Sequence, residues 1–304
     1  MNKTILITGA NGTLAKKLIE KLSTDNDFEV CASSRNIEKT HHFDNVQYIN
    51  NVDLIKTDIL SEVDFILNCA FPRDFKAEIL ADAMEFYAAV VEKAVEQKVK
   101  GIINISSQDI YGTYRENPSS ENDKIHPENN YALTKHACEI IGSTAVKNSD
   151  TKLTNIRLGS LIGKEYPERV INKMITRAFD TKSILINNDK NVFGYMDVED
   201  AVNGLIAFVN NSNPKDWVGI YNFGAKFSEQ RNFEYLANTI HECFIENNID
   251  INLQVQNEER ADRLCLLNSK EFYLIANWQP EISLRQSIEN IFVQIVQNQN
   301  KRIK

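Results

Sequence analysis

The sequence predicts an α/β fold: a doubly wound parallel sheet with helices on both faces, accompanied by a smaller α/β domain. Two observations lead to this prediction. In the first half of the chain, short apolar runs alternate with segments of helical periodicity, and strands connected by such helices pair in parallel. The 304 residues are also enough for a nucleotide-binding domain with a smaller companion.

The expected elements follow one another regularly in the first half. Strands are expected at 3–8, 28–34, 46–49, 64–71 and 101–106, and helices at 13–22, 77–98 and 131–146. The pattern then loosens, with a strand and loop at 152–163, a helix near 170–179, a strand entering a helix at 192–209 and a strand at 219–224. Helix, strand and helix patterns run from there to the C-terminus.

The pattern shows no clean domain boundary, so the second domain is expected to be discontinuous. We expect residues 1–165, joined by 192–225, to form a dinucleotide-binding (Rossmann) domain. Residues 166–191 and 226–304 are expected to form the substrate-binding domain.

Composition excludes several classes of protein. The net charge of −8 argues against a nucleic-acid or anionic-membrane surface, which would need a basic stripe. The five cysteines are scattered without a CxxC pair, and the five histidines show no metal-ligand spacing, so we expect reduced thiols and no metal. With no signal-peptide core and no membrane span, the chain is expected to be cytoplasmic and to act on a small molecule.

A glycine-containing turn joins the first strand to the first helix. It reads Thr8-Gly9-Ala10-Asn11-Gly12-Thr13-Leu14-Ala15. Glycines here let the backbone approach a pyrophosphate, whose charge the helix N-terminus favours. The alternative is a glycine turn without a ligand, but its place between the first strand and helix favours a cofactor. The candidate cofactor residues are Thr8, Gly9, Asn11, Gly12, Thr13 and Leu14.

The end of the second strand indicates which nicotinamide cofactor is bound. NAD sites place an acidic residue there to bond the ribose 2′-hydroxyl, whereas an arginine accommodates a 2′-phosphate. This chain has Ser33, Ser34 and Arg35 and no acid, which favours NADP(H) over NAD(H). The alternative is that Arg35 is only a solvated loop charge.

Tyr131 and Lys135 are the candidate proton-transfer residues. They lie at i and i+4 on one helical face, and the helix follows a strand that ends in Ser106 and Ser107. A nearby lysine is expected to lower the tyrosine pKa from about 10 towards neutrality. A serine hydroxyl can bond the same substrate oxygen while a nicotinamide exchanges a hydride.

In this order, several motifs together resemble one family. They are TGANGTLA, NCA (68–70), SSQDIYG, YALTK, IRLGSLIG (156–163), VEDA (198–201), YNFG (221–224) and NSKEFYLIANWQP (268–280). The chain resembles the extended short-chain dehydrogenases/reductases, the NAD(P)-dependent sugar-nucleotide epimerases, dehydratases and reductases. The resemblance covers nearly the whole chain and implies an oxidoreductase, often a homodimer formed through the tyrosine-bearing helix.

The resemblance also implies roles for individual residues. Tyr131 would be the catalytic acid/base, Lys135 would hold the cofactor ribose, and Ser107 would be the catalytic hydroxyl. The remaining candidates are Asp53, Cys69, Ala70 and Leu158 for the cofactor, and Phe71, Gln108, Asp109, Ser160 and Arg260 for the substrate.

The sequence departs from the family pattern at two informative places. Dehydratases of the family typically carry an Asp-Glu pair after the catalytic Ser/Thr, but this chain has Gln108-Asp109, and an amide is no general acid. Asp109 remains a possible base, or a carboxylate that only caps the loop. Phe193 also stands where the family often has a diphosphate-binding arginine, so Arg260 is either a phosphate ligand or a surface charge.

These features favour an NADPH-dependent reductase of a keto-sugar, with a nucleotide-linked 4-keto-6-deoxyhexose as the expected substrate. A net reductase draws on NADPH, whereas an epimerase returns its hydride to the same substrate. The first alternative is therefore an NAD(P)-dependent sugar-nucleotide epimerase. The second is a non-catalytic NADP-binding sensor or scaffold, against which the joint presence of Ser107, Tyr131 and Lys135 argues.

Overall fold

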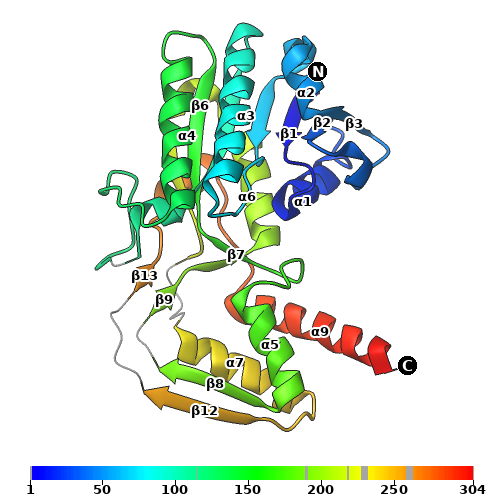
Figure 1. Cartoon of the computed structure of the whole chain (residues 1–304), viewed down its shortest axis with the longest axis vertical. Coiled ribbons are helices and arrows are strands. Elements are labelled where there is room, and N and C mark those ends of the chain that lie inside the picture. Colours follow the sequence, from blue (N-terminus) through cyan, green and yellow to red (C-terminus); the bar gives the residue numbers. More distant parts are fainter. Residues whose placement is uncertain are drawn as a thin grey trace.

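A computed structural model describes residues 2–113, 115–188, 191–217, 219–226, 232–257 and 263–303. In this part of the chain, the main sheet has seven parallel strands (Figure 1). In spatial order they are β11 (Ile220–Phe223), β6 (Lys152–Leu158), β5 (Gly101–Ser107), β4 (Phe65–Asn68), β1 (Lys3–Thr8), β2 (Phe28–Ser34) and β3 (Val46–Asn50). The doubly wound α/β fold predicted from the sequence is confirmed.

Helices cover both faces of this sheet. One face packs against α1 (Thr13–Leu22), α6 (Val198–Asn211) and α8 (Lys270–Ala276), and the other against α2 (Asn51–Lys56), α3 (Ala77–Glu96) and α4 (Asn130–Val146). Short 3-10 helices lie in the connections, at η1 (Ile37–Lys39), η2 (Ile59–Glu62), η3 (Gln108–Tyr111) and η4 (Pro214–Asp216).

Successive side chains of a strand point to opposite faces of the sheet, so each strand contributes to two hydrophobic cores. Ile5 and Ile7 of β1 are fully buried against the α1 side, while Leu6 between them is buried against the α3 side. Burying one such side chain contributes about 1.5–3 kcal/mol. Strands that are buried on both faces therefore read as continuous apolar runs, which is why they were predictable.

A second layer lies beyond the carboxyl ends of the main strands, in the lower part of Figure 1. Three short parallel pairs build it: β7 (Ser160–Ile162) with β10 (Tyr195–Asp197), β8 (Ser183–Asn188) with β12 (Asn252–Asn257), and β9 (Val192–Phe193) with β13 (Leu264–Cys265). The helices α5 (Val170–Thr181), α7 (Phe233–Glu246) and α9 (Leu284–Ile303) surround a separate core that includes Ile175, Ile240 and Phe292.

Some expected boundaries differ from the structure. The strand expected at 64–71 ends at Asn68, where its pairing with β1 stops and the chain crosses the glycine turn. The segment expected as one strand from 192 is two short strands, separated by Gly194 and paired to different partners. The domain boundaries stay a prediction, and one part of residues 226–304 packs on the main sheet: Phe272 of α8 stacks on Phe223 at 3.9 Å between ring centroids.

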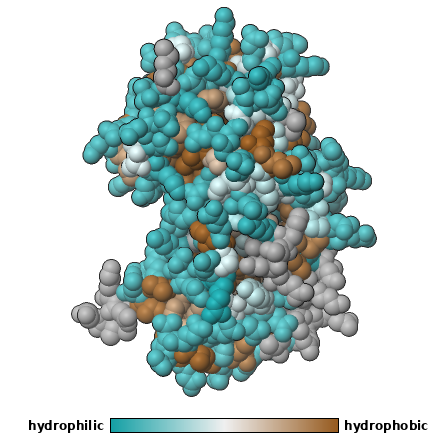
Figure 2. Space-filling model, turned by 180° about the vertical axis from the view of Figure 1, so that it is seen from behind, coloured by the Kyte–Doolittle hydropathy of each residue, from teal (hydrophilic) through white to brown (hydrophobic). Residues whose placement is uncertain are grey.

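On the face opposite to that of Figure 1, the described residues form no large continuous apolar area. Figure 2 shows this face as mostly hydrophilic, with small separated hydrophobic areas and an indentation between the upper and lower parts. Within the described residues, no helix combines the length and apolar character that crossing a membrane requires.

Candidate active site

Two adjoining cavities lie at the carboxyl ends of the main strands. The first has a volume of about 510 Å³ and runs from the glycine turn along β2, α2 and α3. The second, of about 280 Å³, reaches from the same turn to Tyr131 and the start of α5. Gly12, Cys69 and Phe71 line both cavities, so the two form one continuous groove. Ligands of doubly wound sheets bind at this edge.

The glycine turn is built for close approach of the backbone. Gly9 has φ of +76°, and a Cβ there would lie 2.8 Å from the Cα of Ala70, so only glycine fits. Gly12 precedes α1 without a side-chain cap, and the first N–H groups of that helix therefore point into the groove unsatisfied by a cap. Thr13 and Leu14 of the first turn line the second cavity. This arrangement fits a pyrophosphate.

Thr8 supports the turn from below. It is fully buried and does not line either cavity; its Oγ1 donates to Asn68 Oδ1 at 2.7 Å and accepts from Ala70 N–H at 3.3 Å. These bonds tie the ends of β1 and β4 together. Ala70 itself lines the first cavity beside Gly9.

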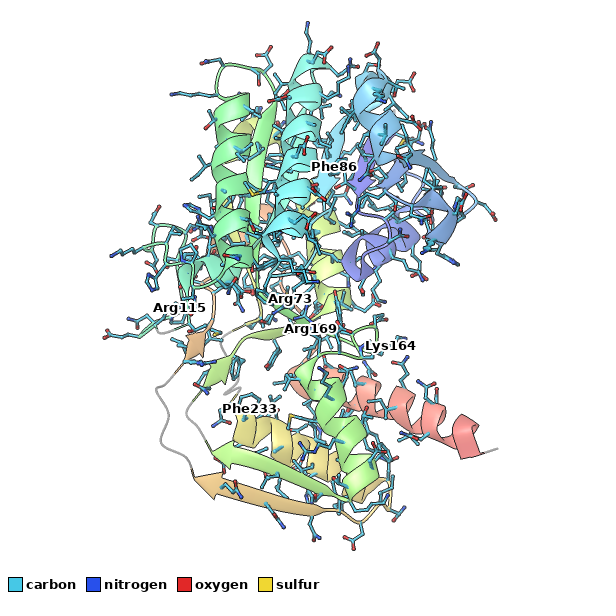
Figure 3. All side chains as sticks on the ribbon, in the orientation of Figure 1. Arg73, Phe86, Arg115, Lys164, Arg169 and Phe233 are labelled. Carbon is cyan, nitrogen blue, oxygen red and sulfur yellow. The ribbon has the colours of Figure 1, made fainter. Side chains whose placement is uncertain are left out.

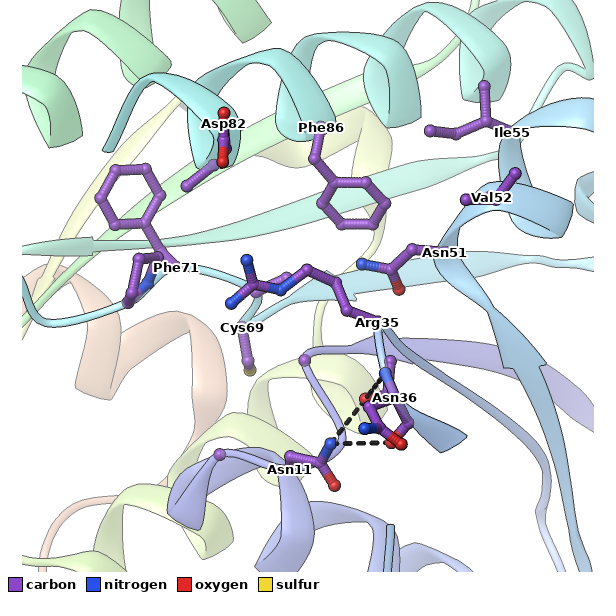
Figure 4. A pocket seen from close by; sticks show the side chains of 16 residues that line it. Asn11, Arg35, Asn36, Asn51, Val52, Ile55, Cys69, Phe71, Asp82 and Phe86 are labelled. Atoms are coloured by element: carbon purple, nitrogen blue, oxygen red, sulfur yellow. Dashed lines mark hydrogen bonds between the residues drawn. The ribbon is translucent and has the colours of Figure 1, made fainter. Parts of the chain in front are cut away.

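Arg35 directly follows β2, is exposed, and lines the first cavity. Figure 4 shows its guanidinium between Asn11 and Asn36 on one side and the α3 side chains Asp82 and Phe86 on the other. Asn11 Nδ2 donates to Ser34 Oγ at 2.7 Å and to Asn36 O at 3.1 Å, which orders the rim. Ser34 lines the cavity, whereas Ser33 is fully buried and is not among the residues that line it.

The end of the first cavity at α2 is lined by residues next to the predicted Asp53. Asp53 is exposed on α2 and is not among the residues that line the cavity, whereas Asn51, Val52 and Ile55 are. The buried Oδ1 of Asn51 has no hydrogen-bond partner in the described structure. A buried amide oxygen without a donor fits the exocyclic amine of an adenine, and Phe86 supplies an apolar wall. The residues present therefore fit a dinucleotide.

The second cavity brings together the three predicted catalytic side chains. Ser107 ends β5, and Tyr131 and Lys135 project from the first turns of α4, whose N-terminus is capped by the Asn129 side chain accepting from Ala132 N–H at 2.9 Å. A side-chain hydrogen bond joins Ser107 and Tyr131. Leu158 at the end of β6 also lines this cavity.

The pKa values of the pair move in a direction that the sequence did not predict. Burial and, to a lesser extent, the charge of Asp109 raise the pKa of Tyr131 to about 12, although Arg73, the Ser107 hydroxyl and Arg169 act in the opposite direction. Burial lowers the pKa of Lys135 to about 8, and its Nζ donates to Ile105 O at 2.6 Å. The expected fall of the Tyr131 pKa towards neutrality is not found without a bound cofactor, because desolvation outweighs the nearby cations Arg73 and Arg169.

Phe71 forms the wall between the cofactor turn and these residues. Its ring lies 6.0 Å from that of Tyr131 in an edge-to-face arrangement, and the Lys135 ammonium lies 4.3 Å from its centroid. Cys69 lines the same wall, and burial raises the pKa of its thiol to about 12, so it stays protonated.

Gln108 is fixed where a family dehydratase would have an acid. It is buried, and its Nε2 donates to Ser160 Oγ at 2.9 Å. Asp109 also lines the cavity, but the hydroxyl of Ser107, accepting from Asp109 N–H at 3.1 Å, caps the short helix η3. Whether the Asp109 carboxylate acts as a base stays a prediction; the structure shows that Asp109 lines the cavity.

Several lining residues carry signals that the sequence reading did not use. Arg73 follows β4 four residues after Cys69, and Tyr166, Glu168 and Arg169 precede α5. All four line the second cavity, and Figure 3 labels Arg73 and Arg169. The available signal for Arg73 was a charged residue in the loop that follows β4, which ends at Asn68. Phe193 stacks on Tyr195 at 5.6 Å and meets Phe233 at 5.0 Å, so the position carries an aromatic contact. Arg260 lies outside the described residues.

A family model with the description "NAD dependent epimerase/dehydratase family" matches residues 5–224. This chain belongs to that family of enzymes. The match spans the glycine turn, the three predicted catalytic residues and the strand β11, and it confirms the resemblance to extended short-chain dehydrogenases/reductases. A nicotinamide cofactor is therefore part of the chemistry.

Individual proteins of known function are distant from this chain. The dTDP-D-glucose 4,6-dehydratase of Homo sapiens is 22% identical, covering 94% of this chain and 88% of that protein. Among solved structures, a Bacillus cereus UDP-glucuronic acid 4-epimerase with NAD and a fluorinated UDP-glucuronic acid has a TM-score of 0.81, 17% identity, and coverage of 97% and 99%. A Bacillus anthracis dTDP-glucose 4,6-dehydratase with NAD has a TM-score of 0.79, 18% identity, and coverage of 99% and 100%. At these identities the structures share the fold.

Proposed function

We propose that this protein is an NADP(H)-dependent reductase of a nucleotide-linked keto-sugar, with a 4-keto-6-deoxyhexose as the substrate class. The observation that carries the cofactor preference is Arg35 inside the first cavity, at a strand end that offers hydroxyl and amide groups and no carboxylate. A 2′-phosphate would meet a guanidinium there. Net reduction with NADPH is the reaction that this preference serves.

Tyr131 would act as the proton donor. The bound nicotinamide supplies the hydride for the carbonyl carbon and is oxidised. With a pKa of about 12, the Tyr131 phenol is protonated at neutral pH, as a donor to the carbonyl oxygen must be. Ser107 would polarise the same oxygen. The phenolate left after transfer regains its proton from water, and the Lys135 ammonium stabilises it.

Gln108 supports reduction over dehydration. A 4,6-dehydration needs an acid for the leaving hydroxyl, and the amide of Gln108 is held by Ser160 in the place of that acid. The convergence of Ser107, Tyr131 and Lys135 on one cavity likewise supports an enzyme over a sensor or scaffold.

A second candidate is a sugar-nucleotide epimerase. Membership in the NAD dependent epimerase/dehydratase family favours it, as does the NAD bound in the Bacillus cereus epimerase of the same fold. Epimerisation would require Tyr131 to start as a phenolate and remove a hydroxyl proton, which the raised pKa of the phenol disfavours.

We further infer a homodimer that works in a reducing compartment such as the cytoplasm. Leu133 and Ile140 are seven residues apart on one face of α4 and are 56% and 55% exposed, which supports a helix-to-helix contact with a second copy. All five cysteines are free thiols. Size-exclusion chromatography with light scattering tests the dimer: a Leu133→Lys variant should elute as a monomer, and a wild-type monomer would refute the inference.

The experiment for the reaction is a panel of nucleotide-linked keto-sugars with NADPH or NADH, followed by the absorbance of the reduced nicotinamide. Reduction with a clear NADPH preference is the expected result. Stoichiometric, non-exchanging NAD(H) in the purified protein, together with interconversion of two sugar epimers, would instead establish the epimerase.

A further inference from the structure

Two arginines that no family motif predicted face the second cavity together. Arg73 lies in the connection between β4 and α3, and Arg169 is the residue that precedes α5. Both line the cavity that contains Tyr131, and Figure 3 labels them at the junction of the main sheet with the second layer. Elements far apart in sequence therefore direct two cations into one substrate-sized space.

The two guanidinium groups influence each other and the catalytic tyrosine. Partial burial and then the Arg73 charge lower the pKa of Arg169, so the two like charges are close enough to repel. Both charges also lower the pKa of Tyr131, opposing its burial. An anion placed between them would relieve the repulsion.

The carboxylates nearby leave this charge poorly compensated. Glu168 approaches Arg169 only at 3.9 Å, and its side chain is 63% exposed, so water screens the pair. Asp109 is the other carboxylate on the cavity wall, and its effect on Tyr131 is opposite to that of the arginines. The Arg169 guanidinium also packs 5.2 Å from the centre of the Tyr166 ring, which holds it towards the cavity.

Because position 193 carries an aromatic residue, binding of an anionic group depends more on Arg73 and Arg169. Phe193 is stacked on Tyr195 and carries no charge, although the family often has an arginine there. Arg73 and Arg169 both act electrostatically on Tyr195 of the same strand region. Positive charge is thus supplied from the β4–α3 connection and from the start of α5.

We propose that Arg73 and Arg169 form an anion subsite that holds a carboxylate or phosphate group of the substrate beside Tyr131. Guanidinium groups bind such oxyanions through paired, charge-assisted hydrogen bonds. The anion is either the diphosphate that links the sugar to its nucleoside or a carboxylate on the sugar, and a sugar carboxylate would replace the 6-deoxyhexose as the substrate class. The proposal rests on the nucleotide-sugar substrate proposed above. It adds that the substrate carries a negatively charged group that Arg73 and Arg169 bind.

Calorimetric titration with three ligands distinguishes the two sources of the anion. UDP-glucuronate and UDP-glucose differ only in the sugar carboxylate, and UDP contains the diphosphate without a sugar. The variants are Arg73→Gln and Arg169→Gln; Arg177→Gln, an exposed arginine of α5 that lines neither cavity, is the matched control. All are measured with and without NADPH.

A subsite for a sugar carboxylate predicts that both variants lose about 10-fold or more in affinity for UDP-glucuronate and little for UDP-glucose. A subsite for the diphosphate predicts a similar loss for all three ligands. Unchanged affinities in both variants, with the control also unchanged, would overturn the proposal.

Inorganic pyrophosphate is the probe if none of the three ligands binds the wild-type protein. Pyrophosphate binding that is lost in both variants supports the subsite, and binding that is absent or indifferent to both substitutions overturns it. Because these measurements follow binding alone, failure of every keto-sugar to be reduced would refute the proposed reaction and leave the subsite standing.

Discussion

The guanidinium of Arg157 and the carboxylate of Glu139 form a buried, two-pronged ion pair beneath the catalytic residues. Arg157 Nε donates to Glu139 Oε1 at 3.0 Å, and Arg157 Nη2 donates to Oε2 at 2.8 Å. Both side chains are at most 4% exposed. The pair joins β6 to α4, one helical turn after Lys135.

Further hydrogen bonds extend this pair towards the active site. Ser106 Oγ donates to Glu139 Oε1 at 2.6 Å, and Arg157 Nη1 donates to the hydroxyl of Tyr111 at 2.7 Å. Both Ser106 and Ser107 line the second cavity, but the hydroxyl of Ser106 is engaged by Glu139 and anchors the helix. The network fixes the height of Tyr131 and Lys135 above the end of β5.

Glu139→Gln is expected to destabilise the protein by about 3–5 kcal/mol, because it leaves the Arg157 charge buried without a counter-charge. Urea unfolding followed by circular dichroism measures the change. Glu92→Gln on the exposed side of α3 is the control and should change the free energy of unfolding by less than about 0.5 kcal/mol. If Glu139→Gln lost no more unfolding free energy than the control, the ion pair would position the helix without stabilising the fold.

Lys135 should make the protein more stable as the pH rises. Its pKa is lowered from 10.5 to about 8, so between these values the unfolded chain binds more protons than the folded one, and stability increases with pH. Below about pH 8 the buried ammonium opposes folding. Comparison with Lys135→Met isolates this effect from that of the buried thiols and tyrosines.

We expect the unfolding free energy of the wild-type protein to rise relative to that of Lys135→Met as the pH increases from 8 to 10. The rise is at most about 1.4 kcal/mol per pH unit. Urea unfolding at several pH values, without added cofactor, provides the measurement. A difference that is independent of pH would mean that the folded protein does not depress this pKa.

Much of the fold was predictable because its strands are buried on both faces. Runs such as KTILIT and GIINIS can only be central strands, and the turn between β1 and α1 needs Gly9 for its positive φ. The second layer was harder to predict, since β9 and β10 are two and three residues long and pair with segments distant in the sequence. Pairing of such short strands is decided by tertiary contacts.

In the candidate site too, some features could be predicted from the sequence and others could not. Residues adjacent to a strand end, such as Ser107 and Arg35, could be placed from the sequence because parallel strands deliver their ends to one edge. Asp53 was expected near the cofactor, but the helix α2 turns it outwards and presents Asn51 instead. The direction in which the Tyr131 pKa shifts depends on burial, and burial cannot be predicted from the i, i+4 spacing to Lys135.

Arg35→Ala should weaken NADPH binding by about 10- to 100-fold and leave NADH binding nearly unchanged, because only NADPH carries the 2′-phosphate. Fluorescence titration of the reduced nicotinamides measures both affinities. Lys39→Ala is the matched control, since Lys39 is exposed nearby and does not line the cavity. Equal losses for both cofactors would assign Arg35 to general shaping of the cavity and remove the support for NADP(H).

Tyr131→Phe tests the chemistry with the smallest change in shape, since it removes the proton donor and keeps the ring beside Phe71. Turnover should fall by about 10²- to 10⁴-fold, the usual contribution of a positioned acid. NADPH affinity should stay within about twofold, because the glycine turn and the β2 end hold most of the cofactor. Tyr235→Phe on α7, outside both cavities, is the control. If Tyr131→Phe reduced every accepted ketone at the wild-type rate, proton donation would have to come from another lining group, with Asp109 the next to be substituted.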